Sequence, residues 1–178
     1  MGAIFSPCGL YRYRLDRQCG LLGRLVFAYF GVNCSTAGPV ENDQTVAKWI
    51  GFTERNRGYR FVVGNPFAYV SKDVRALAKA VDPIGPENDR YLAGIIAEAD
   101  ILVPCWGNRN KLPRALRPRL DVLRDMIFAA GKPVRIWGLT ASGDPIHPLM
   151  LGYDTPLMDW SFDASLPPSE ASQEACRG

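Results

Sequence analysis

The chain has 178 residues, of which 47% are hydrophobic and 22% charged, and this composition is ordinary for a globular protein with a buried core. No apolar stretch approaches the roughly 18 residues of a membrane span, and the first residues lack the pattern of a secretion signal. The formal net charge of +3 permits a polyanionic partner without requiring one. We therefore expect a single cytoplasmic domain over residues 1–160 and a tail over 161–178 that has little apolar surface to bury.

Several function classes are excluded by missing motifs. The five cysteines are odd in number and have no C-x-x-C spacing, so we expect neither a disulfide framework nor a zinc site. The phosphate-binding loop of kinases, the dinucleotide fingerprint of dehydrogenases and the nucleophile elbow of serine hydrolases are also absent. We expect no cofactor and no metal.

Five segments have strand patterns. An alternating segment at residues 11–15 predicts a short edge strand, and the apolar run over 25–32 predicts a strand buried on both faces. Three later runs predict further core strands, at residues 60–64, 101–106 and 133–139.

Helical patterns lie between these strands. Asn42 or Asp43 can cap a helix that runs to about Arg57, and three further helices are predicted at residues 74–80, 86–99 and 113–130. Strands that alternate with helices imply a parallel sheet with right-handed crossovers. We therefore predict an α/β fold of three layers, α/β/α, around a four-stranded parallel central sheet.

Each predicted core strand ends in a polar or aromatic residue. Asn33, Asn65 and Trp106 follow the first three, and Thr140 leads from the fourth toward His147. Ligands of α/β sheets bind at the carboxyl ends of the strands, so we expect these residues to surround one crevice. A single asparagine at such a position could equally be a turn residue.

The residue types at these ends suit a small planar group such as a nucleobase. The amide of Asn65 has both a donor and an acceptor, and it could pair with a pyrimidine edge. Phe67 could stack on the base or belong to ordinary loop packing, and Trp106 could line a pocket or fill the core.

Two further residues are candidates for catalysis. His147 is the only histidine, and Pro145 and Pro148 hold it in a stiff loop. Asp43 is the carboxylate best placed to lie near the Asn33 loop, together with Glu41, although it could be a helix cap alone.

The clearest cluster of cations lies between residues 109 and 119. It could follow a nucleic-acid backbone or form the solvated face of a helix. Its members are Arg109, Lys111, Arg114, Arg117 and Arg119.

Six short motifs occur in order along the chain. They are Tyr11-Arg12-Tyr13-Arg14-Leu15, Asn33-x-Ser35-Thr36-Ala37, Asn42-Asp43-x-Thr45, Asn65-Pro66-Phe67, Trp106-Gly107 and His147-Pro148-Leu149. Together they resemble a bacterial and phage domain family of unknown function over about residues 11–151. Cys34 departs from the pattern, which usually has proline there.

More distantly, the plan resembles the uracil-DNA glycosylase superfamily, whose enzymes have a four-stranded parallel sheet. That resemblance implies that Asn33 helps to position the hydrolytic water, Asn65 reads the base, His147 contacts the base and Leu149 enters the duplex as an apolar wedge. The usual aspartate of the first loop is absent, so Asn33 resembles the mismatch-specific branch. Asp43 then becomes the candidate for the catalytic carboxylate.

The function implied by this resemblance is base excision, with defence against phages that carry modified DNA as a setting. The enzyme would hydrolyse the N-glycosidic bond of a modified pyrimidine in double-stranded DNA and leave an abasic site. Leu149, Arg109, Lys111 and Arg114 would contact the DNA, and Phe67 and Trp106 the flipped base. Two alternatives remain open: a non-catalytic reader of modified bases or single-stranded nucleic acid, and an N-glycosidase that acts on free nucleosides or nucleotides.

Overall fold

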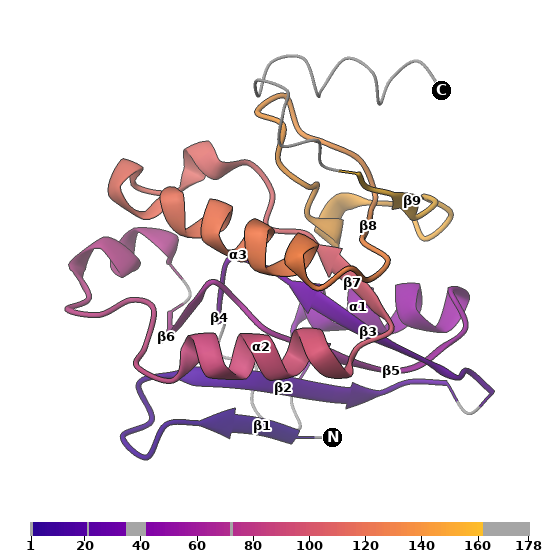
Figure 1. Ribbon diagram of the computed structural model, residues 1–178, viewed down its shortest axis with the longest axis horizontal. Helices are drawn as coiled ribbons and strands as arrows, with labels where there is room; N and C mark the ends of the chain where they lie inside the picture. Colours follow the sequence, from indigo (N-terminus) through magenta and orange to yellow (C-terminus); the bar gives the residue numbers. More distant parts are fainter. Residues whose placement is uncertain (1, 21, 35–41, 72, 162–178) are drawn as a thin grey trace.

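The computed structural model describes residues 2–20, 22–34, 42–71 and 73–161, so nearly all of the predicted tail lies outside it. In this described part the fold is mixed α/β, built on a five-stranded sheet in the order β1-β2-β5-β3-β7 (Figure 1). The strands are β1 (Gly2–Phe5), β2 (Arg12–Gln18), β3 (Leu25–Phe30), β5 (Gly58–Val63) and β7 (Ile101–Pro104).

The sheet is parallel in its centre and antiparallel at one side. β3 lies between β5 and β7 and runs parallel to both, whereas β2 runs antiparallel to β5 and to β1. The predicted strand at residues 11–15 is therefore not an edge strand, because β1 covers it. A four-stranded parallel sheet is not confirmed, since only a single parallel bridge between Leu102 and Val134 continues the sheet beyond β7.

The predicted strand at 133–139 is the element that the structure shortens most. Only β8 (Arg135–Ile136) is a strand, and it pairs antiparallel with β9 (Met158–Asp159). Gly138 has a φ of +132°, which takes the chain out of the extended conformation. Residues 139–145 then fold back on themselves, with Leu139 bridged to Pro145.

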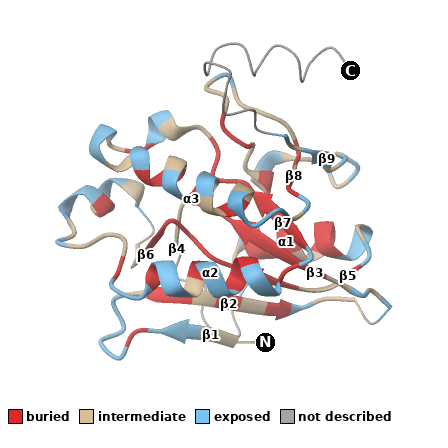
Figure 2. Ribbon diagram, in the orientation of Figure 1, coloured by how far each residue is buried: buried red, intermediate tan, exposed pale blue. Residues whose placement is uncertain are grey.

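Helices cover both faces of the sheet, which gives the three predicted layers. α1 (Gln44–Arg55) packs on the face that bears Phe27 and Tyr29, in one hydrophobic cluster. α2 (Asn88–Glu98) and α3 (Pro118–Ala129) pack on the opposite face in a second cluster. Because alternate residues of β3 point to opposite faces, this strand contributes side chains to both clusters. Figure 2 shows that the central strands of the sheet are buried.

Short helical turns replace parts of the predicted helices. The helix predicted from residue 113 begins at Pro118, because proline is favoured in the first helical turn, and two 3-10 turns precede it: η2 (Arg109–Lys111) and η3 (Arg114–Leu116). Residues 74–80 form the 3-10 helix η1 (Val74–Lys79). Among the described residues, no helix combines the length and the apolar character needed to cross a membrane.

Candidate functional site

A cavity of about 720 Å³ lies at the carboxyl ends of the parallel strands. The three parallel strands each lead into a different part of its wall. Asn65 follows β5, Gly31 follows β3 and Trp106 follows β7, while His147 comes from the loop after β8. Arg12, the first residue of β2, also reaches the cavity, because β2 runs antiparallel to β5 and so begins at this edge.

The cavity collects most of the residues that the sequence singled out. Those that line it are Asn33, Asp43, Asn65, Trp106, Lys111, His147 and Leu149. Three residues of the first motif, Ser35, Thr36 and Ala37, lie outside the described residues, as does Glu41.

Asn65 is held rigidly between β3 and α2. Its side chain is 5% exposed, and its Oδ1 accepts a hydrogen bond of 3.2 Å from the backbone N–H of Gly31. Asn88 Nδ2 donates to the backbone oxygen of Asn65 at 3.0 Å. A Cβ at residue 31 would lie 3.0 Å from Asn65 Oδ1, so glycine allows this close approach. The orientation of the Asn65 amide is therefore fixed before any ligand binds.

Asn33 belongs to a small parallel sheet formed by β4 (Asn33–Cys34) and β6 (Phe67–Val70). Its Nδ2 donates to the backbone oxygen of Ser71 at 2.5 Å, and Ser71 also lines the cavity. The two residues form one wall of the cavity.

Asp43 is the N-cap of α1 and also a wall residue. Its Oδ1 accepts a hydrogen bond of 2.8 Å from the backbone N–H of Val46. The carboxylate also lies at the positive end of the helix dipole. The cap therefore does not exclude a second role, since the side chain lies at the cavity.

His147 is the N-cap of the 3-10 turn η4 (Pro148–Met150), and its Nδ1 accepts a hydrogen bond of 3.3 Å from Leu149 N. An accepting Nδ1 has no proton, so the neutral ring carries its proton on Nε2. Burial lowers the pKa of His147, the positive charge of Lys111 lowers it further, and Asp43 acts in the opposite direction. At neutral pH the ring is a neutral hydrogen-bond donor.

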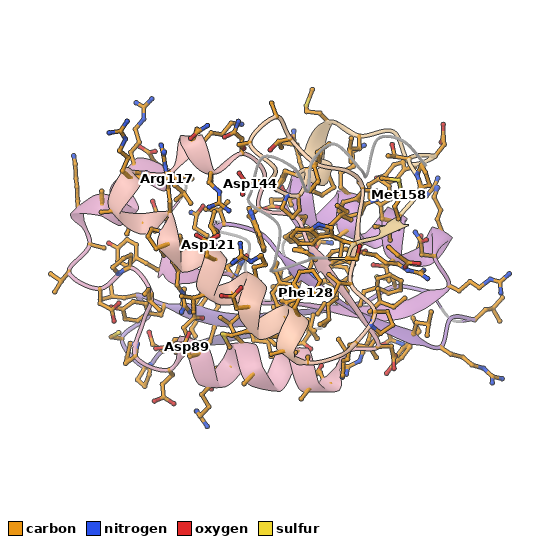
Figure 3. All side chains as sticks on the ribbon, turned by 45° about the horizontal axis from the view of Figure 1, so that its top comes forward. Asp89, Arg117, Asp121, Phe128, Asp144 and Met158 are labelled. Carbon is orange, nitrogen blue, oxygen red and sulfur yellow. The ribbon has the colours of Figure 1, made fainter. Side chains whose placement is uncertain are left out.

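Asp144 was not among the predicted site residues, yet it joins the two loops that carry Trp106 and His147. It is fully buried and accepts hydrogen bonds from Trp106 Nε1 at 3.3 Å and from Ser142 Oγ at 2.7 Å. Arg109 donates to it twice, from its backbone N–H at 2.9 Å and from Nε at 2.8 Å. Figure 3 labels Asp144 and, on α3, Asp121, the second carboxylate bound by Arg109. The sequence feature that could have pointed to Asp144 is its position three residues before the only histidine, His147.

A second joint lies between α1 and the segment after η4. Lys48 Nζ donates to the backbone oxygen of Leu151 at 2.6 Å, and the hydroxyl of Tyr153 donates to the backbone oxygen of Ala47 at 3.4 Å. The ammonium of Lys48 also lies 4.4 Å from the centre of the Tyr153 ring. Through these contacts the helix that Asp43 caps is fastened to the chain that follows Leu149.

Three residues that were predicted to contact a base or a nucleic-acid backbone do not line the cavity and have structural contacts. Phe67 is fully buried in the hydrophobic cluster beneath α2 and α3, so it packs in the core instead of lining the cavity. Arg109 forms ion pairs with both Asp121 and Asp144. Arg119 is 8% exposed and is bound by Asp89 and by the backbone oxygen of Pro66.

The remaining cations and the apolar turn lie at the surface or at the cavity. Lys111 and Arg114 are exposed, and Arg117 donates to the backbone oxygens of Leu112 and Asn110. Leu149 is half-buried, whereas its neighbour Met150 is 90% exposed and also lines the cavity. Sequence reasoning missed Met150, because an isolated methionine carries no pattern.

Residues 12–149 of the chain match DUF1643, a family of proteins of unknown function. The match covers more than three quarters of the chain. The chain belongs to this family. The DUF1643 region begins at Arg12 and ends at Leu149, so of the described residues that line the cavity only Met150 falls outside it. A search of curated proteins and a search of solved structures found no match. Among the described residues, no group of three or more histidine, cysteine, aspartate or glutamate side chains could hold a metal ion.

Proposed function

We propose that this protein is a DNA glycosylase that hydrolyses the N-glycosidic bond of a modified pyrimidine, such as a hypermodified phage base, and leaves an abasic site. One observation carries the proposal: a neutral imidazole donor, an oriented amide and a carboxylate line the same cavity. These are His147, Asn65 and Asp43. The cavity volume of about 720 Å³ lies within the range of about 300–1,000 Å³ that is usual for small-ligand sites.

The chemistry of base release needs groups of these kinds. As water attacks C1′ of the sugar, the base leaves with the electron pair of the glycosidic bond, and the proton that the water loses restores the neutral base. Positive charge builds on the sugar and negative charge on the base. The Nε2–H of His147 would stabilise the base anion, and the carboxylate of Asp43 would oppose the sugar cation. A preorganised group of this type contributes about 3–4 kcal/mol in a site that excludes water.

The two asparagines and the turn η4 would position the base, the attacking water and the DNA. Asn65, whose orientation Gly31 fixes, would read the base edge, and Asn33 would help to place the attacking water. Extruding a base costs a few kcal/mol. Leu149 and the exposed Met150 would offset part of that cost by filling the space that the base leaves in the duplex.

The arrangement of the strands supports the same proposal. β5, β3 and β7 run parallel in that order, and Val134 continues the order beyond β7 by its bridge to Leu102. We infer that these four segments correspond to the four-stranded parallel sheet of the uracil-DNA glycosylase superfamily, with β1 and β2 as additions on one side. The aromatic surfaces available to a base are then those of Trp49 and Trp106, which line the cavity.

The test is an assay of base release. Purified protein is incubated with ordinary duplex DNA and with DNA that carries hypermodified pyrimidines, and both alkali-labile abasic sites and released bases are measured. We expect release from the modified DNA only. Tight binding of modified DNA with no base released would contradict the glycosylase and favour a reader of modified bases.

Two variants locate the chemistry. Asp43→Asn keeps the shape and the capping oxygen but removes the charge, and His147→Ala removes the donor. Each should slow single-turnover base release by roughly 10²–10³-fold while DNA affinity stays nearly unchanged. Asp159→Asn is the matched control, since this carboxylate lies in an exposed ion pair with Arg135. Full activity in Asp43→Asn would remove the role assigned to that carboxylate.

A further inference from the structure

Lys111 bears a primary amine in the wall of the cavity, and the base-release chemistry proposed above gives this amine no part in making bonds. Among the described residues that line the cavity, no other has an amine. An unprotonated lysine amine attacks the carbonyl carbon of an aldehyde and forms a Schiff base. The product of base release is an abasic site, whose sugar opens to an aldehyde at C1′. The cavity therefore holds a nucleophile suited to the product of the proposed reaction.

The backbone of η2, which carries Lys111, is held on both sides. Before Lys111, Arg109 donates from its backbone N–H and from Nε to Asp144, in the loop between β8 and η4. After it, Leu112 is 3% exposed, and its backbone oxygen accepts a hydrogen bond of 3.1 Å from Arg117 Nε. Figure 3 labels Asp144 and Arg117, which hold the two sides. The point from which the Lys111 side chain extends is therefore fixed relative to the cavity.

The ammonium at the end of this side chain is not engaged in the same way. Among the described residues, no hydrogen bond or ion pair holds the ammonium of Lys111, which is exposed and lines the cavity. Lys48 instead donates to the backbone oxygen of Leu151, and Lys132 to two backbone oxygens at the end of α2. Lys79 is exposed but lies outside the cavity wall. Of these four described lysines, only Lys111 combines an unbound ammonium with a place at the cavity.

Electrostatic effects relate Lys111 to the proposed reacting atoms. Burial lowers the pKa of His147 most, the positive charge of Lys111 lowers it next, and the charge of Asp43 raises it. The charges of Lys111 and Asp43 therefore both reach the same imidazole. In the proposed base release Asp43 faces the sugar and His147 faces the base, so C1′ would lie between them. The flexible four-carbon stem of a lysine lets its amine approach such an atom.

We propose that Lys111 forms a Schiff base with the abasic sugar and that the enzyme then cleaves the DNA strand by β-elimination. This inference rests on the proposed function, because the product of base release is its substrate. The protein would then be an abasic-site lyase as well as a glycosylase.

The steps need neither an oxidant nor a cofactor. The ammonium of Lys111 gives a proton to water, the neutral amine adds to C1′, and loss of one water molecule leaves the imine. The imine makes the C2′–H bond acidic. Water takes that proton, the electron pair forms a double bond between C2′ and C3′, and the C3′–O3′ bond breaks with its electrons on the departing phosphate. Water then hydrolyses the imine, which frees Lys111 and leaves an unsaturated aldehyde at the new 3′ end.

The test uses duplex DNA with one preformed abasic site, so it needs no base release by this protein. Wild-type protein and labelled duplex are mixed with sodium cyanoborohydride, which reduces an imine to a stable amine and so links the protein to the DNA. We expect a covalent complex on a denaturing gel and a DNA-linked tryptic peptide that contains Lys111. Without the reductant, we expect cleavage of the strand at the abasic site.

Two matched variants test the assignment to Lys111. Lys111→Arg keeps the positive charge but removes the amine. It should slow both trapping and strand cleavage by roughly 10²-fold or more. Lys79→Arg makes the same change at an exposed lysine outside the cavity wall, so it should trap and cleave as the wild type does. If Lys111→Arg does not bind the duplex in an anisotropy measurement, the lysine found in the linked wild-type peptide decides the matter.

Several outcomes would overturn the proposal. They are no covalent complex with the wild type, trapping that survives in Lys111→Arg, or a linked peptide that holds a different lysine. Trapping at Lys111 without strand cleavage would overturn the elimination step. Base release from modified DNA with no trapping on the preformed site would contradict the Schiff base alone. Trapping and cleavage of the preformed site, with no base released from any DNA, would contradict the proposed glycosylase alone.

Discussion

At the scale of single residues, the proposed chemistry depends on the protonation of one imidazole. His147 Nδ1 accepts from Leu149 N, so a second proton can enter only by breaking that hydrogen bond. Burial and Lys111 oppose this proton, and Asp43 favours it. Because the chain has one histidine, its ring can be followed by NMR without any assignment problem.

Titration of the His147 ring by NMR should give a pKa below the ordinary value of 6.5. Lys111→Gln should raise this pKa, because it removes a repelling charge, and Asp43→Asn should lower it further, because it removes an attracting one. Shifts of the same sign in both variants would contradict the electrostatic arrangement.

The lowered pKa of His147 also makes the stability of the fold depend on pH. Since the folded-state pKa lies below 6.5, the unfolded chain takes up this proton first as the pH falls. The contribution of His147 to the free energy of unfolding is therefore intact above pH 6.5 and declines below it, until the folded-state pKa is passed. Thermal unfolding of wild type and His147→Gln across this window should show a shallower loss in the variant.

Asp144 is the residue whose loss should disturb the site most without touching a ligand. Asp144→Asn keeps the shape but removes a fully buried charge that binds Arg109 and Trp106. We expect a loss of about 2–3 kcal/mol in the free energy of unfolding by denaturant. Asp159→Asn, at an exposed pair, should cost about 0.5 kcal/mol or less. Equal losses in the two variants would show that Asp144 is not a structural joint.

At the scale of elements, the turn after β7 is set by a glycine. Gly107 has a φ of +71°, and a Cβ added there would lie 3.4 Å from His147 Cβ. Its backbone N–H donates to Pro145 O at 2.8 Å, so the turn after β7 supports the loop that carries His147.

Replacing Gly107 with alanine should therefore affect both stability and the site. Gly131 offers the control, since its φ is +63° and a Cβ there would meet nothing within 4 Å. Each alanine should cost about 1 kcal/mol in unfolding free energy through its backbone conformation. Only Gly107→Ala should also shift the NMR pKa of His147 and slow base release. A shift of the same size in Gly131→Ala would refute the link between turn and loop.

Local patterns predicted the parallel strands and the helices well, since apolar runs and caps are properties of the sequence itself. β3, β5, β7, α1 and α2 begin and end within a few residues of their predicted bounds. α3 begins five residues later than the predicted start at residue 113, because Pro118 is its first residue. β1 was missed, because four residues without strong alternation become a strand only through pairing with β2.

At the scale of the whole molecule, the candidate site follows from the order of strands more than from any motif. That polar residues after parallel strands would meet at one edge could be predicted, and Asn33, Asn65, Trp106 and His147 do meet there. That Arg12 would join them could not, since the direction of β2 is set by its pairing with β5. The ion pairs of Arg109 with Asp144 and of Arg119 with Asp89 could not be predicted either, because each pair joins residues that are distant in the sequence.

Fewer cations of the segment 109–119 lie unpaired at the surface than the sequence suggests, so fewer would contribute to binding of DNA. Lys111 and Arg114 are the exposed cations of the predicted basic segment, whereas Arg109 and Arg119 are held by ion pairs. The double variant Lys111→Gln/Arg114→Gln should flatten the dependence of log affinity on log salt by about two units. The slope should be measured by fluorescence anisotropy, and no change in it would assign both cations to an ordinary solvated surface.

The contacts of Lys48 and Tyr153 with the chain around α1 also determine which parts of the cavity can move. They tie the helix that bears Asp43 to the segment that follows His147, so we expect the carboxylate and the imidazole to move together. If the cavity opens, we expect this unit to separate from the wall formed by Asn33 and Ser71. The spacing of Asp43 and His147 would then stay constant while the entrance widens and narrows.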